Sequence, residues 1–259
     1  MRVRRERLTP PWRDGSEREA SSLAQFRADL LRRVTPIPLT IAMELKSRGL
    51  VGIEPSVMSA QLLSATLSWV ARLPELASII HAIVTDIHLL DAEAGYDVSH
   101  SEPRWRTTIF VSIPDRDDEV GALRLAESIV HEAMHLHLTN REQLIQFVAR
   151  GDGKLRSPWR NEPRPFQGVL HGLYVFSCLS WFFRRLLVEG ALCAAGCTHL
   201  AKRLEDISDD VHSIDLVALA GGLTKAGIAL AEQCMGIAVD RPAGQESLPA
   251  GVWMGLTRK

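Results

Sequence analysis

The chain has 259 residues, of which 46% are hydrophobic and 24% are charged, so it is long enough to bury a sizeable core. Its 30 basic and 31 acidic residues leave a formal net charge of -1, which gives no global electrostatic reason to expect a nucleic acid or an acidic membrane as partner. No apolar segment follows the basic start, and no uninterrupted apolar run reaches the roughly 18 residues of a membrane span. We therefore expect a cytoplasmic protein.

The first half of the chain is mainly helical in its patterning. Residues 1–20 are charged and contain proline, which predicts a poorly ordered basic N-terminus. Apolar spacing over residues 21–49 predicts two helices separated by a break at Thr35–Pro38, and residues 59–70 predict a third. The apolar, β-branched run over residues 77–90 fits both a helix and a strand, and the pattern leaves that choice open.

The middle of the chain is more distinctive. Residues 105–113 are rich in strand-forming side chains and end at Pro114, which predicts a strand whose exposed edge could pair with a peptide. Asp117 or Asp118 can cap a helix that runs from about residue 118 to Thr139. Residues 150–165 hold two glycines and three prolines, which predicts a long irregular loop of the kind that often binds ligands.

The last part of the chain is helical again. A long apolar helix is predicted from Phe166 to Val188, followed by helices over residues 191–207 and 211–234 and by a C-terminal tail over residues 241–259. The expected fold is α+β and predominantly helical, with a small antiparallel sheet. Residues 21–240 are expected to form a single domain.

One motif carries chemistry. His131 and His135 are four residues apart on the central predicted helix, so both imidazoles can reach one metal ion at about 2.0 to 2.1 Å. Glu132 between them can act as general base on a metal-bound water, or can support the site from outside the coordination sphere. The competing interpretation is that His131 and His135 are surface or core histidines that bind no ligand. Their apolar neighbours indicate, however, that this part of the helix faces the core.

A third ligand has to come from another segment. His171 is our choice, because it stands near the start of the next apolar helix, where an imidazole has few other uses. Gly172 beside it allows another chain segment or a ligand to approach closely. Glu189 competes for the role, but the adjacent Gly190 indicates a helix end and an exposed carboxylate. His137 lies on another helical face from His135, so we expect it not to bind metal.

The companions of a zinc peptidase are missing from this sequence. Residues 136–146 contain no glycine and no histidine other than His137, so no third histidine follows the motif at short range. No Asn-Glu pair of the thermolysin type is found on a following helix.

A resemblance emerges from three segments taken together. They are the motif from His131 to His135, the loop from Ser157 to Pro165, and the helix start Gly168–Tyr174. This combination resembles the HExxH-motif proteins that modify ribosomally made peptides, over roughly residues 77–189. The resemblance implies an Fe(II)- and 2-oxoglutarate-dependent peptide β-hydroxylase, in which the three histidines bind iron and Glu132 lies close by. Its partners would be a precursor peptide and O2.

The co-substrate 2-oxoglutarate also needs a cation for its distal carboxylate, which a guanidinium matches with two prongs. Arg160 and Arg164 are best placed, with solvated loop arginines as the competing interpretation. Tyr174, one turn beyond His171, is expected to face the same cavity unless it is a plain core residue. Trp159 either forms a cavity wall or anchors the loop.

Three functions therefore remain open. The first is the iron oxygenase, the second is a zinc peptidase with Glu132 as general base, and the third is a non-catalytic peptide-binding protein. The sequence does not define the modified residue, the need for a leader peptide or the oligomeric state. It also leaves open whether Glu132 binds the metal directly and which of the two arginines would hold 2-oxoglutarate.

Overall fold

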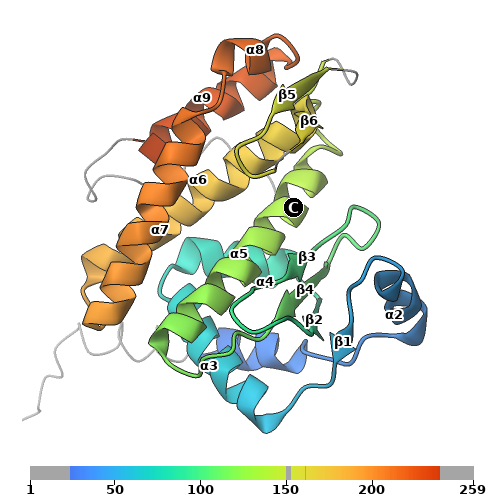
Figure 1. Cartoon of the computed structure of the whole chain (residues 1–259), viewed down its shortest axis with the longest axis vertical. Coiled ribbons are helices and arrows are strands. Elements are labelled where there is room, and N and C mark those ends of the chain that lie inside the picture. The colour runs from blue at the N-terminus through green and yellow to red at the C-terminus, as the bar shows by residue number, and fades with distance from the viewer. Residues whose placement is uncertain (1–23, 150–152, 161, 240–259) are drawn as a thin grey trace, which may run out of the picture.

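The computed structural model describes residues 24–149, 153–160 and 162–239. The predicted N-terminal segment 1–20 and the predicted tail 241–259 both lie outside these residues. Within them the protein is predominantly helical with a small sheet, as predicted (Figure 1).

Two helices flank the predicted break near residue 35. Residues 24–32 are helical, and α2 spans Leu39–Lys46. The extended segment between them joins the sheet region, because the amide of Thr35 donates to the carbonyl of Ile87 at 3.1 Å. Two further helices follow, α3 over Val57–Ala71 and α4 over Pro74–Ile83.

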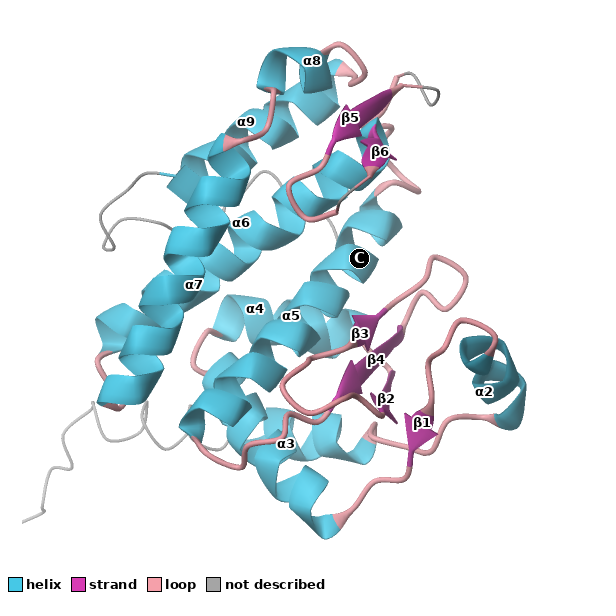
Figure 2. Ribbon diagram, viewed as in Figure 1, coloured by secondary structure: helices cyan, strands magenta, loops and turns pink. Residues whose placement is uncertain are grey.

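The sheet has four strands, and its pairing is mixed rather than purely antiparallel (Figure 2). Its strands in chain order are β1 (Gly52–Ile53), β2 (Asp86–Leu90), β3 (Ser99–His100) and β4 (Thr108–Ser112). The spatial order is β1-β2-β4-β3, with β2 and β4 parallel and the outer strands antiparallel. The predicted strand is therefore present as β4, but it lies inside the sheet, and β3 forms the edge on its side.

The helix α5 (Glu119–Arg141) is the centre of the molecule and carries the histidine motif. It begins at Asp118, whose carboxylate accepts a hydrogen bond from the amide of Gly121 at 3.0 Å. It packs against β3 and β4 on one side and against α3, α4, α6 and α7 elsewhere. Most of its residues are buried as a result, including the polar Glu132 and His137.

The region predicted to be an irregular loop contains a short hairpin. Strands β5 (Lys154–Arg156) and β6 (Pro163–Pro165) pair antiparallel, with Leu155 opposite Arg164. The two prolines of β6 stand on either side of this central pair, at positions where the pairing does not need an N–H. Two prolines in one segment are therefore compatible with a strand, although the composition alone predicts irregular structure there.

The helix α6 (Phe166–Glu189) follows the hairpin directly and ends at Gly190, whose φ of +66° is the left-handed conformation that glycine favours. By length and composition α6 could cross a membrane, but 72% of its most apolar 18-residue stretch is buried inside the protein. The described residues contain no other helix of this kind. This burial is typical of a core helix.

The C-terminal part forms three helices, α7 (Ala194–His212), α8 (Leu216–Ala220) and α9 (Lys225–Val239). The prediction of one helix over residues 211–234 was wrong. The helix is interrupted before α9, because the backbone amide of Thr224 donates to the carbonyl of Phe147 at 2.8 Å. The Thr224 hydroxyl then accepts a hydrogen bond from the amide of Gly227 and caps α9. A tertiary contact thus overrides a continuous apolar pattern.

Candidate metal centre

Two imidazoles of the motif meet on one face of α5. The Nε2 atoms of His131 and His135 lie 3.1 Å apart, and the ring centroids are 4.8 Å apart. One helical turn separates the two residues, so the spacing of four along the sequence produces this proximity.

The third imidazole comes from the first turns of α6. The ring of His171 stacks on that of His135 with centroids 5.7 Å apart, and their Nδ1 atoms are 3.4 Å apart. The structure therefore brings His131, His135 and His171 together from two helices.

The arrangement is not a preformed coordination sphere. His135 turns Nε2 toward His131 and Nδ1 toward His171, and a single imidazole ordinarily offers one ion only one of its nitrogens. Within the described ranges, no group of three or more His, Cys, Asp or Glu side chains is already arranged to hold a metal ion. Binding of one ion by all three rings thus requires rotation of an imidazole.

The chemistry of the donor set nevertheless fits a metal ion. Burial lowers the pKa of His131 to about 4, with Arg160 contributing, and lowers the pKa of His135 to about 3, with His131 contributing. Both rings are therefore neutral at pH 7 and keep the lone pair that a metal requires.

Glu132 is held by two serines. Its side chain is 5% exposed, and it accepts hydrogen bonds from the Ser99 hydroxyl at 2.6 Å and from the Ser101 hydroxyl. One of its oxygens lies 4.0 Å from Nε2 of His131. Sequence reasoning missed both serines, although their spacing of two places them on one side of an extended segment.

These groups line a cavity of about 810 Å³. The cavity is bounded by β3 and the segment after it, by α5 and by the start of α6, and its lining includes all three histidines, Glu132, Arg160 and Arg164. Arg160 is exposed, and Arg164 lies 3.4 Å from a carboxylate oxygen of Glu162. Both predicted guanidinium groups are thus at the cavity.

Tyr174 is not part of this lining. Its side chain is buried, and its hydroxyl lies 2.6 Å from Nδ1 of His137 on the neighbouring helix. The two residues face each other inside the core, so Tyr174 has no place in the cofactor pocket that we predicted. Glu189, the competing third ligand, contacts Arg72 at 3.3 Å and also lies outside the cavity lining.

Trp159 anchors the loop to α6. Its ring stacks on Phe176 with centroids 4.8 Å apart, and the rings of Phe176 and His131 form a T-shaped pair with centroids 5.4 Å apart. A Cβ atom at Gly172 would lie 2.3 Å from the Trp159 ring. The absence of a side chain at Gly172 therefore leaves room for this indole, and the Trp159–Phe176 stack packs against the ring of His131.

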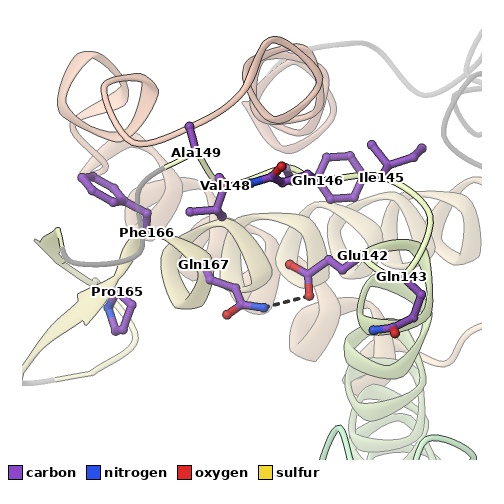
Figure 3. Close-up of a pocket in the computed structure, with 10 residues that line it drawn as sticks. Glu142, Gln143, Ile145, Gln146, Val148, Ala149, Pro165, Phe166 and Gln167 are labelled. Atoms are coloured by element: carbon purple, nitrogen blue, oxygen red, sulfur yellow. Dashed lines mark hydrogen bonds between the residues drawn. The ribbon is translucent and has the colours of Figure 1, made fainter.

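A second cavity of about 510 Å³ borders the first, since Pro165 and Gln167 line both (Figure 3). Glu142 points into this region from the end of α5 and accepts a hydrogen bond from Gln167 at 2.8 Å. Its other oxygen, Oε1, lies 3.2 Å from Nε2 of His171, without the alignment of a hydrogen bond. Sequence reasoning missed Glu142 because it is two turns beyond the motif.

Comparison with known proteins gives no match, either to a family model or to a curated protein.

Proposed function

We propose that this protein is an Fe(II)- and 2-oxoglutarate-dependent oxygenase that β-hydroxylates a residue of a ribosomally made precursor peptide in the cytoplasm. The observation that carries the proposal is the convergence of His131, His135 and His171 on a cavity that two arginines also line. Bound Fe(II), with 2-oxoglutarate and O2, supplies the oxidation of a peptide C–H bond to C–OH, with succinate and CO2 as the other products.

The residues of the chain have distinct tasks in this proposal. The three imidazoles would hold the metal, and the adjoining cavity would admit 2-oxoglutarate and the peptide. In our proposal Arg160 binds the distal carboxylate of 2-oxoglutarate. Arg160 lines the cavity and forms no ion pair with any residue of the described ranges, whereas Arg164 already forms an ion pair with Glu162. The cavity volume of about 810 Å³ leaves room for a peptide side chain beside a small dicarboxylate.

Glu132 supports the site without binding the metal in this proposal. Each of its oxygens already accepts a serine hydroxyl, so the carboxylate is fixed near His131. Three neutral imidazoles bring no negative charge to a dication, and a buried carboxylate nearby offsets part of that charge.

A zinc peptidase is the second candidate. The observation in its favour is that Glu132 lines the same cavity as the histidines, beside the edge strand β3, which could pair with an extended peptide. The two serine contacts argue against it, because a general base has to be aimed at a metal-bound water.

Anaerobic reconstitution with Fe(II) and 2-oxoglutarate tests the proposal. Chelation of iron by the keto acid gives a visible metal-to-ligand charge-transfer absorption, which we expect for the native protein and not for His131→Ala. His212→Ala is the matched control, because it removes an exposed histidine of α7. Absence of the band in the native protein, together with zinc-dependent peptide cleavage that Glu132→Gln abolishes, would establish the peptidase instead.

A further inference from the structure

Glu142 belongs to a four-residue contact network at the junction of α5 and α6. It stands at the C-terminal end of α5, and its Oε2 accepts a hydrogen bond from the side-chain amide of Gln167 at 2.8 Å (Figure 3). Gln167 and His171 are one turn apart on α6, so they present their side chains to the same carboxylate. His171 then reaches His135 through its other ring nitrogen.

The two nitrogens of His171 face different groups. Nε2 lies 3.2 Å from the Glu142 carboxylate, and Nδ1 lies 3.4 Å from the nearest nitrogen of His135. Nε2 is buried and has no hydrogen-bond partner within the described residues, while the side chains of His171 and Glu142 are only 12% and 15% exposed. In a neutral imidazole, a carboxylate close to one ring nitrogen favours the tautomer that carries its proton on that nitrogen.

We infer that Glu142 is a positioning residue, held by Gln167, which fixes the proton of His171 on Nε2 and leaves Nδ1 as the metal-binding atom. The inference rests on the proposed metal centre and extends it. Metal-ligating histidines usually donate their second N–H to a carboxylate or carbonyl, and loss of such a partner typically weakens metal binding by about 10- to 100-fold. A modest rotation that aligns the 3.2 Å contact would complete this pairing.

The test is metal affinity rather than turnover. We expect Glu142→Gln to weaken Co(II) binding, measured by competition with a chelator, by about 10-fold or more. Glu205→Gln removes the same charge from an exposed site on α7 and is expected to leave the affinity unchanged. In a His171→Ala background Glu142→Gln is expected to have no further effect, because both changes act through the same ring.

The metal-free protein provides a second readout. The 15N chemical shifts of the His171 ring are expected to report the Nε2-protonated tautomer in the native protein, and a mixture of tautomers in Glu142→Gln. A merely structural role for Glu142 would leave this ring unchanged.

The outcomes separate the two proposals. Native-like Co(II) affinity in Glu142→Gln, together with a weakened His171→Ala variant, overturns the positioning role and leaves the metal centre standing. Additive losses in the double variant also overturn it. Failure of the native protein to bind Co(II) overturns both proposals.

Discussion

Gly172 is a residue at which the absence of a side chain is structurally required. A Cβ atom there would lie 2.3 Å from the ring of Trp159, so Gly172→Ala has to displace an indole that also stacks on Phe176. We expect a loss of about 1 to 3 kcal/mol in the free energy of unfolding, measured in urea. Gly236→Ala on α9 is the control, because nothing except its chain neighbours and its own helical backbone lies within 4 Å of an added Cβ, and it should be neutral or stabilising. Equal stability of the two variants would contradict the packing argument.

The hydroxyls of Ser99 and Ser101 both donate to the buried carboxylate of Glu132. Replacing both by alanine leaves a carboxylate of 5% exposure without its two hydroxyl donors. We expect a loss of about 3 kcal/mol in unfolding free energy in the metal-free protein, because an unsatisfied buried charge is costlier than a neutral group. Glu132→Gln in that double variant should recover part of the loss, and Ser47→Ala, at an exposed position, should cost little. A double variant as stable as the native protein would show that water replaces the hydroxyls.

The site illustrates which residues a sequence can identify. His131 and His135 follow from helical spacing alone, and His171 follows from the fact that an imidazole is unusual in an apolar helix. The same reasoning fails for Tyr174. It stands three residues after His171, and at that spacing its side chain points into the core, where it contacts His137. Which side of α6 faces α5 and which faces the cavity is a tertiary fact that spacing does not contain.

At the scale of elements, helices with clear periodicity were predicted well and ambiguous runs were not. The apolar run over residues 77–90 divides into α4 and β2, because residues 86–90 lie beside β4 and are almost all buried. Its composition fits both structures, and only the neighbouring strand makes the choice. The break between α8 and α9 likewise depends on the pairing of Thr224 with Phe147.

The start of α5 makes a prediction about pH. A hydrogen bond from Arg116, and then one from the amide of Gly121, lower the pKa of Asp118 to about 2. A carboxylate with a lowered folded-state pKa stabilises the fold above its ordinary pKa of 3.8, and this contribution is lost as the pH falls toward 2. We therefore expect the urea midpoint of the native protein to exceed that of Asp118→Ala at pH 6 and the difference to shrink at pH 3. A difference of the same size at both pH values would mean that the ionised carboxylate does not matter for the cap.

At the scale of the whole molecule, α5 lies between two groups of elements. The sheet with α3 and α4 packs on one side of it, and α6 with α7 packs on the other (Figure 1). The candidate site lies where these groups meet, since two histidines belong to α5 and the third to α6. An ion held by all three would therefore join two long helices that already meet through the His137–Tyr174 and Gln167–Glu142 contacts.

This arrangement predicts that metal binding stabilises the entire fold. A ligand that binds only the folded state at 100 times its dissociation constant adds about 2.7 kcal/mol to the free energy of unfolding. For a domain of this size we expect Co(II) to raise the melting temperature of the native protein by about 5 to 10 °C. His131→Ala and His171→Ala should each lose most of the shift, although they alter different helices, whereas His212→Ala on the exposed face of α7 should keep it. A full shift in His171→Ala would mean that α6 contributes nothing to the ion, and the centre would then consist of α5 alone.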